Sequence, residues 1–222
     1  MALHTRRTEL VAGGAIFGAM SSILTLANIA IPFPPLPYLT FDFGQIPVVI
    51  ATLLYGPLAG TISVVEYFGI LELVGSFRPV GPILRLLATG SIVLAIYVAG
   101  RVYSRLASEP KLKRFTLISL GLSSLFTIPI MTIANIVVLL ILFPFFLTYA
   151  NASLGTFLGI NFVGESGLFI IILFTVIYNF LQLLITIIPS TGLSTVAVLR
   201  RHGYVPTKYW IARYMPSKTD KI

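Results

Sequence analysis

The sequence contains no cysteine, only two histidines and few charged residues. Without cysteine, the chain can form no disulfide, no thiolate metal site and no cysteine-based catalytic centre. His4 and His202 stand at opposite ends of the sequence, which argues against a histidine-based metal site. A G-x-x-x-x-G-K-[ST] phosphate loop and a G-x-S-x-G nucleophile elbow are also missing. We therefore expect no enzyme, no catalytic residue, no metal and no cofactor.

Charged side chains make up only 10% of the 222 residues, whereas 57% of the residues are hydrophobic. The mean hydropathy is accordingly high, at +0.98. A soluble domain normally carries about 25% charged residues, so this chain has too little polar surface for water. The net charge of +8 is compatible with nucleic acid as a partner. The basic residues, however, flank apolar segments instead of forming one patch, so we expect a membrane and no nucleic acid.

Six apolar segments are long enough, or nearly so, to be membrane helices. We predict them at 9–29, 45–55, 58–74, 83–103, 115–143 and 166–199. The stretch 148–165 is predicted as a loop that has room for a short re-entrant helix. The first apolar segment exceeds the ~7–15 residues of a signal-peptide core, so we expect it to be retained. The predicted fold is an all-α integral membrane protein with six transmembrane helices in one domain, residues 1–222.

The basic residues predict how these helices are oriented. With six spans, 13 of the 15 lysines and arginines lie in the two termini and in the 101–114 linker, all on one side. Because cytoplasmic segments carry the excess of lysine and arginine, we expect a plasma-membrane protein with both termini in the cytoplasm. The 31–43 segment, the turn that contains Arg78 and the 148–165 stretch then face outward together.

A proline-rich and aromatic segment, IPFPPLPYLTFDF at 31–43, joins the first two predicted helices. Prolines and turns leave backbone carbonyl groups without helical partners, and such groups cannot face lipid. We therefore expect this loop to cap an outward-facing cavity or to lie at the membrane surface, where its aromatic rings face a ligand.

Arg85 lies about one turn into the fourth predicted helix. A cation at the centre of a bilayer costs at least ~2.5–3.5 kcal/mol, so this residue requires an explanation. Three alternatives are open. Arg85 extends to the membrane surface, or it pairs with Glu66 or Glu72 of the third helix, or it binds a solute that carries carbonyl or phosphate groups.

Three amides, those of Asn135, Asn179 and Gln182, lie within apolar helices. Each one either bonds a neighbouring helix or faces a ligand. Asn179 and Gln182 are three residues apart, so they share one face of the last helix. Amides offer both donors and acceptors, which suits the uracil-like edge of a flavin ring.

Several of these motifs resemble a known family. PYLTFDF, the IP that follows it and GPLAG at 56–60 are similar to the signature of the substrate-binding S components of energy-coupling-factor (ECF) vitamin transporters, most of all the riboflavin-type branch. PVGP at 79–82 and Asn135 also match, and the Tyr178–Asn179 pair resembles the family's Phe-Asn. The resemblance implies the substrate-binding and translocating subunit of an ECF-type ABC importer. It further implies riboflavin or a related flavin as the transported ligand, with a transmembrane coupling subunit and two ATPase subunits as partners.

In riboflavin-type S components the vitamin is held near the outer face by the first loop and helices four to six. This implies a substrate site that contains Tyr38, Leu39, Thr40, Phe41, Asn135 and Asn179, to which the polar residues above add Arg85 and Gln182. Family members usually have lysine at the position of Gln182 and asparagine at that of Arg85. Another small vitamin-like solute is therefore the alternative ligand, and a membrane enzyme or stand-alone carrier is the alternative from another class.

Ala15 and Ala19 form an A-x-x-x-A motif in the first helix, next to Gly14 and Gly18. Small residues four apart let another helix approach closely. The approaching helix belongs either to the same bundle or to another protein. In S components the motif at this place docks the coupling subunit, so the resemblance implies that Ala15 and Ala19 bind that partner.

Overall fold

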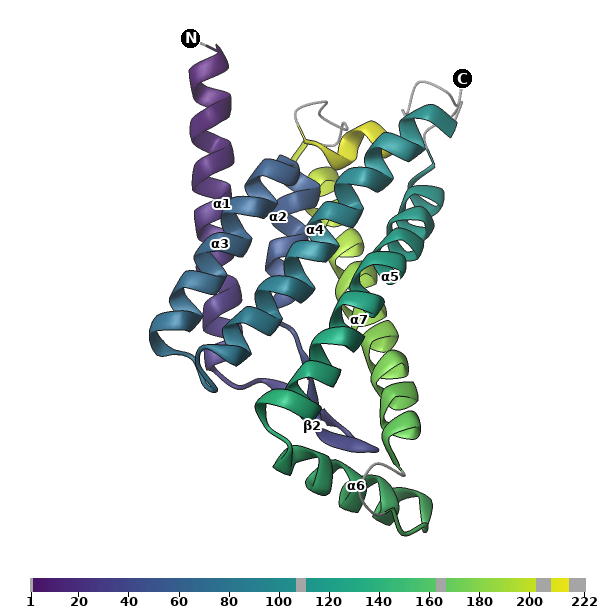
Figure 1. Cartoon of the computed structure of the whole chain (residues 1–222). Helices are drawn as coiled ribbons and strands as arrows, with labels where there is room; N and C mark the ends of the chain where they lie inside the picture. Colours follow the sequence, from purple (N-terminus) through teal and green to yellow (C-terminus); the bar gives the residue numbers. More distant parts are fainter. Residues whose placement is uncertain (1, 107–110, 163–166, 203–208, 216–222) are drawn as a thin grey trace.

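The computed structural model describes residues 2–106, 111–162, 167–202 and 209–215, and most of them are helical (Figure 1). Five helices are long: α1 (Ala2–Leu26), α3 (Pro57–Val74), α4 (Val80–Leu106), α5 (Leu112–Val137) and α7 (Leu168–His202). Shorter elements are α2 (Gln45–Tyr55), α6 (Phe145–Leu158), the π-helical η1 (Val138–Leu142) that continues α5, and the 3₁₀ turn η3 (Ile211–Tyr214).

Five segments are long and apolar enough to cross a membrane: Arg7–Leu26, Pro57–Val74, Val80–Arg105, Leu112–Leu142 and Leu168–Leu199. The second predicted span, α2, has the expected bounds of 45 and 55 but only 11 residues. At 1.5 Å per residue it is ~16 Å long, about half the hydrocarbon core of a bilayer. Five of the six predicted transmembrane helices are therefore candidate membrane spans, and the remaining one, α2, is an apolar helix too short to span by itself.

The short helix α2 is buried in the middle of the bundle. It contacts α1, α3, α4 and α7, and eight of its eleven residues are buried. Pro47 lies in its first turn, where the missing N–H needs no partner. Gly56 ends the helix with a φ of 102°, and Pro57 then begins α3. Because its neighbours shield it from lipid, α2 can be shorter than a bilayer is thick.

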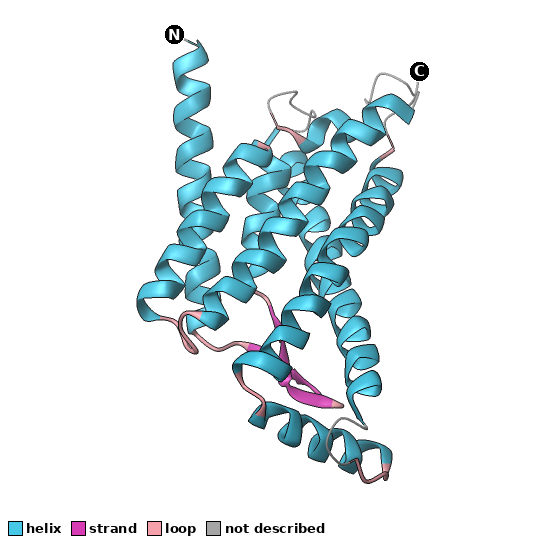
Figure 2. Cartoon of the chain, in the orientation of Figure 1, coloured by secondary structure: helices cyan, strands magenta, loops and turns pink. Residues whose placement is uncertain are grey.

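The 31–43 segment was expected to be an irregular loop. It contains a β-hairpin instead (Figure 2). Strand β1 (Ala30–Phe33) pairs in antiparallel fashion with β2 (Leu36–Asp42), with Ala30 opposite Asp42 and Pro32 opposite Thr40. Proline is tolerated on an edge strand, and both strands of a two-stranded sheet are edges. Strand pairing gives this proline-rich segment partners for its backbone groups.

The two ends of the bundle differ in what they carry. The start of α1 and the segment 209–215 lie at one end, whereas the hairpin and α6 lie at the other (Figure 1). Part of the predicted 148–165 loop is helical, because α6 continues as far as Leu158 and ends at Gly159 with a φ of 70°. The residues 163–165 of that stretch lie outside the described residues. Helix α6 runs across the end of the bundle (Figure 1), so the 148–165 prediction was right only in allowing a short helix.

Candidate substrate site

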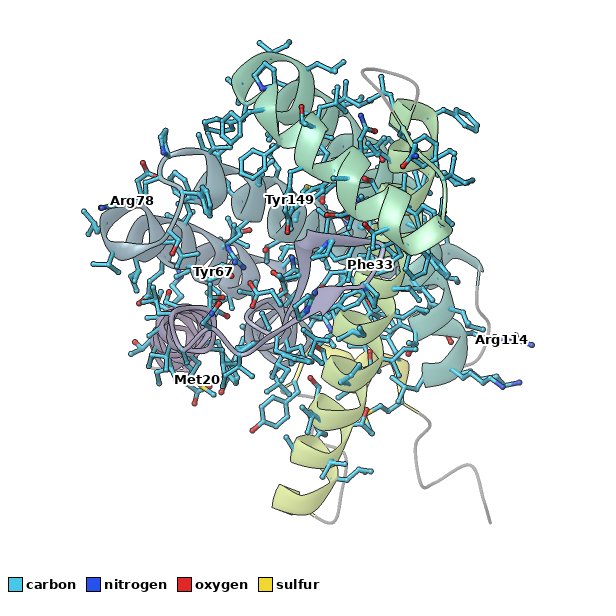
Figure 3. The ribbon with its side chains drawn as sticks, turned by 90° about the horizontal axis from the view of Figure 1, so that it is seen from below. Met20, Phe33, Tyr67, Arg78, Arg114 and Tyr149 are labelled. Carbon is cyan, nitrogen blue, oxygen red and sulfur yellow. The ribbon has the colours of Figure 1, made fainter. Side chains whose placement is uncertain are left out.

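The hairpin is fixed over the end of the bundle by apolar packing. Leu39 of β2 is buried in a cluster with Phe33 and Leu36 of the hairpin, Leu139 of η1 and Leu154 of α6. Figure 3 looks onto this end, with Tyr149 on α6 nearest the viewer and Phe33 on the hairpin beside it. The hairpin, which carries the four predicted site residues 38–41, therefore covers this end of the bundle.

The aromatic rings of the hairpin contact α7. The Phe41 ring stacks on Tyr178, with centroids 5.1 Å apart and an interplanar angle of 30°. The Tyr178 hydroxyl donates a 2.7 Å hydrogen bond to the carbonyl oxygen of Thr40. Phe33 meets Phe41 edge-on at 5.8 Å. One face of the Phe41 ring is thus covered by Tyr178, and a ligand can stack only on the other face.

Tyr38 carries a buried hydroxyl group on the same strand. Its ring lies 6.4 Å from that of Phe146. Its oxygen is buried beside Thr175 and makes no well-aligned hydrogen bond within the described residues. Burial raises the pKa of the Tyr38 phenol, so the group stays protonated at neutral pH and remains able to donate a hydrogen bond.

The amides of Asn135 and Asn179 are buried on α5 and α7, which pack side by side. Each amide uses one N–H within its own helix, to Met131 O at 2.8 Å and to Thr175 O at 2.9 Å. Neither makes another hydrogen bond among the described residues. Each therefore has a carbonyl oxygen and a second N–H available to a ligand.

Both amides lie close to the hairpin. Asn179 follows Tyr178, which bonds Thr40. Asn135 lies one turn before Leu139, which packs in the cluster that holds Leu39. The structure thus brings both predicted amides to the hairpin end.

Gln182 is engaged by the protein itself. Its Nε2 donates to Asp42 O at 2.8 Å, and its Oε1 accepts from Asp42 N at 3.2 Å. Nε2 also lies 3.2 Å from Thr186 Oγ1. The side chain therefore binds the end of β2 much as a neighbouring strand would, and in this arrangement it holds the hairpin on α7.

Arg85 pairs with Asp42, which is not among the predicted partners. Its Nη1 forms an ion pair with Asp42 Oδ2 and donates to Tyr67 Oη at 3.2 Å. Of the three alternatives, pairing with an acidic residue is the one observed, but the partner is neither Glu66 nor Glu72. A sequence signal existed, because Asp42 is the one acidic residue between Glu9 and Glu66.

The carboxylate of Asp42 joins three helices to the hairpin. It accepts hydrogen bonds from Thr25 Oγ1 of α1 at 3.1 and 3.2 Å, and from Tyr67 Oη of α3 at 3.2 Å. The N–H of Gly44 donates to it at 2.8 Å. Arg85 of α4 supplies the positive charge. Gly44 has to be small here, since an added Cβ would lie 2.1 Å from Thr25 Oγ1.

A cavity of about 720 Å³ opens beside α6 at the same end. Its lining comes from α6 and the residues that follow: Thr148, Asn151, Ala152, Gly155, Thr156, Gly159, Ile160, Asn161 and Phe162. The lining offers hydroxyl and amide groups and no charged side chain, and the volume is in the range of small-molecule pockets. None of the eight predicted substrate-binding residues lines this cavity.

The small residues of α1 divide between two surroundings. Gly14 and Gly18 are buried against α3, where an added Cβ would lie 2.9 Å from Ile62 Cβ and 3.0 Å from Ser63 O. Ala15 and Ala19 are half-buried, beside exposed apolar residues of the same helix. The glycines thus pack within the bundle, while the alanines keep part of their surface on the outside.

Comparison with known proteins identifies the family. Residues 11–193 match the family described as "ECF transporter, substrate-specific component". The chain belongs to this family. This substrate-specific component is a membrane protein that works with an ECF module, and it is not an enzyme, as its sequence predicts.

Two named relatives and one solved structure are similar to this substrate-specific component. Riboflavin transporter RibU of Staphylococcus aureus (strain TCH60) is 30% identical over 139 residues, which cover 63% of this chain and 69% of RibU. Riboflavin transporter FmnP of Bacillus subtilis (strain 168) is 33% identical over 138 residues, which cover 60% of this chain and 67% of FmnP. The structure of the S component of a bacterial ECF transporter matches with a TM-score of 0.60 at 24% identity, over 87% of this chain and 95% of that one. The S-component fold is therefore confirmed.

Proposed function

We propose that this substrate-specific component binds riboflavin or a closely related flavin at the hairpin end of the bundle and delivers it across the membrane. Support comes from the two relatives, which are named as riboflavin transporters. The observation that carries the proposal is the pair of buried amides, Asn135 and Asn179, each with a carbonyl oxygen and an N–H to spare. The uracil-like edge of a flavin alternates carbonyl and N–H groups and can satisfy both amides.

The hairpin supplies the other contacts of the proposed site. Leu39 and Phe41 flank the flat ring system, and aromatic stacking contributes about 0.5–1.5 kcal/mol beyond burial. Tyr38 donates a hydrogen bond from its protonated phenol. Thr40 lies between Leu39 and Phe41, and its carbonyl oxygen accepts a hydrogen bond from Tyr178. Arg85 and Gln182 border the site.

The proposed topology has six passes, with α2 as a short pass inside the bundle, and both termini in the cytoplasm of a plasma-membrane protein. An even number of passes agrees with the described ends of the chain lying at one end of the bundle (Figure 1). Five exposed basic residues of the α4–α5 connection gather there: Arg101, Arg105, Lys111, Lys113 and Arg114. The basic residues 208, 218 and 221 of the tail lie outside the described residues.

The proposed partners are a transmembrane coupling subunit and two ATPase subunits. The part-exposed Ala15 and Ala19, flanked by Ile16 at 60% exposure and Met20 at 45%, give a partner helix a shallow surface to approach. Close approach over small residues is how helices associate in lipid.

Calorimetry with riboflavin on the purified protein tests the proposed ligand. We expect binding to the wild type, and a loss of affinity of about ten- to a hundredfold in Asn135→Ala, because one buried group of the ligand is left unpaired. The absence of riboflavin binding to the wild type would contradict the proposal. Mass spectrometry of the co-purified ligand would then identify the alternative vitamin-like solute.

A further inference from the structure

Asp42 stands directly after the four hairpin residues of the proposed site, 38–41, and is itself only 6% exposed. It is paired with Ala30 at the base of the hairpin, where β2 leads into α2. Its backbone is bound by Gln182 of α7 on both its N–H and its carbonyl oxygen. The base of the hairpin is thus the point at which polar groups attach it to the bundle.

The side chain of Asp42 attaches the hairpin to further helices. Its carboxylate is shared by Arg85, Thr25 and Tyr67, which come from three different helices. Thr25 and Tyr67 are also in contact with each other, at 2.7 Å between their oxygens. In Figure 3, Tyr67 lies close to α1, on the side of the hairpin away from α6. The rest of β2 is held by apolar packing and by the bond from Tyr178 to Thr40.

The guanidinium of Arg85 is directed to this carboxylate, while 32% of the Arg85 side chain stays exposed. Its Nη1 contacts both Asp42 Oδ2 and Tyr67 Oη. The carboxylate is the more buried member, with 9% of the Asp42 side chain exposed. A charge that is taken out of water is left uncompensated when its partner is removed. Asp42 therefore depends on Arg85 for its counter-charge.

We infer that Asp42 and Arg85 form a latch that holds the hairpin closed over the substrate. Both are positioning residues, because they act on the ligand through residues 38–41 and do not touch it. Opening of the hairpin for substrate exchange then requires this pair to separate. The inference rests on the proposed function for the identity of the ligand but not for the attachment of the hairpin.

The first test measures riboflavin dissociation by stopped-flow fluorescence. Asp42→Asn and Arg85→Gln should each raise the dissociation rate about tenfold or more, because the hairpin then opens more readily. The double variant Asp42→Asn/Arg85→Gln should dissociate more slowly than either single variant, since it leaves no unpaired charge. Arg85→Lys keeps the charge and should lie between Arg85→Gln and the wild type.

The control is Arg78→Gln, the same substitution at an exposed arginine in the connection between α3 and α4. It should leave the dissociation rate unchanged. If Arg85 instead contacts the ligand, Arg85→Gln will weaken binding and Asp42→Asn will neither match it nor be rescued in the double variant. Either unchanged single variants or additive effects in the double variant would overturn the latch.

The second test needs no ligand. Because the chain has no cysteine, Pro34→Cys at the exposed tip of the hairpin accepts a single spin label. Electron paramagnetic resonance should show a more mobile label when Asp42→Asn is added, and no change when Arg78→Gln is added. Thr25→Val, which removes one donor to the carboxylate, should act in the same direction with a smaller effect and serves if Asp42→Asn does not fold.

The two tests separate the latch from the proposed ligand. Increased mobility of the label without any riboflavin binding would sink the flavin assignment and leave the latch intact. An unchanged label in both Asp42→Asn and Thr25→Val would overturn the latch whatever the ligand is.

Discussion

The two ends of the bundle differ in what they add to apolar packing. The hairpin end combines an apolar cluster around Leu39 with an ion pair and hydrogen bonds that converge on Asp42. The opposite end, where the described part of the tail lies, is packed with aromatic rings. There the rings of Phe115 and Tyr214 stack in parallel with centroids 4.1 Å apart, and Tyr103 and Trp210 meet Tyr214 edge-on.

The segment 209–215 closes that second end. The N–H of Trp210 donates to Leu54 O of α2 at 2.9 Å, and Ile211 is fully buried. An added Cβ on Gly100 of α4 would lie 2.7 Å from both the Trp210 ring and the Tyr214 hydroxyl, so the fit is tight. Buried polar groups are costly unless they are bonded. We therefore expect substitutions at the tail end to affect mainly stability, and those of Asn135 and Asn179 at the hairpin end to affect mainly the binding of the proposed ligand.

The largest expected effect concerns neither end of the bundle but the outer surface of α1. Replacement of Ala15 and Ala19 by leucine should block the approach of a partner helix and abolish uptake. Riboflavin binding to the isolated subunit should survive, because these residues lie outside the proposed site. Uptake into vesicles tests the loss of transport, and calorimetry tests whether riboflavin binding survives. Normal uptake in the double variant would show that α1 is not the docking surface.

The next effect concerns the tail end. Phe115→Ala should lower the free energy of unfolding by about 3–5 kcal/mol, because it leaves a cavity among rings that cannot fully collapse. Riboflavin affinity of the folded fraction should stay within a few-fold of the wild type. Thermal unfolding in detergent measures the loss, with Phe145→Ala, at an exposed phenylalanine of α6, as the matched control. A large loss of affinity together with preserved stability would reverse the division between the two ends.

At the hairpin end the expected effects are the opposite. Asn179→Ala should weaken riboflavin binding by about 1–3 kcal/mol and change the melting temperature little. The control is Asn161→Ala, an exposed amide that lines the cavity beside α6. If Asn161→Ala loses the affinity and Asn179→Ala keeps it, the ligand occupies that cavity and not the proposed site.

The smallest effect is that of a single hydroxyl group. Tyr38→Phe should weaken binding by about 1 kcal/mol, the usual value of one neutral hydrogen bond. Since the wild-type hydroxyl has no well-aligned partner among the described residues, its loss should not destabilise the ligand-free protein. Equal affinities for Tyr38→Phe and wild type would remove Tyr38 from the proposed site.

Local signals predicted some elements well. The bounds of α2, 45 and 55, agree with the sequence because Pro47 opens the helix and Gly56–Pro57 ends it. The long apolar runs likewise predicted five spans, since length and hydropathy are properties of a segment by itself. The predicted amides at 135 and 179 lie at the hairpin end, because the position of a residue along a membrane-spanning helix determines how near it is to either end of the bundle.

Features that depend on distant contacts were missed. One strand of the hairpin contains Pro32, and a proline within a segment argues against a strand there. The partner of Arg85 lies 43 residues earlier in the chain, and only the folded bundle brings α4 to β2. The insertion of 209–215 into the bundle was missed for the same reason, since a basic, aromatic tail looks like a surface segment.

The central claim is that the substrate binds at the hairpin end, and site-specific protection tests it most directly. In the cysteine-free chain, Thr40→Cys on β2 and Ser104→Cys on the exposed end of α4 are each labelled with a maleimide, with and without saturating riboflavin. We predict that riboflavin slows labelling of Thr40→Cys about tenfold or more, as expected for a site more than 90% occupied, and leaves Ser104→Cys unchanged. Equal labelling of Thr40→Cys in both conditions, in a protein that binds riboflavin, would contradict the account.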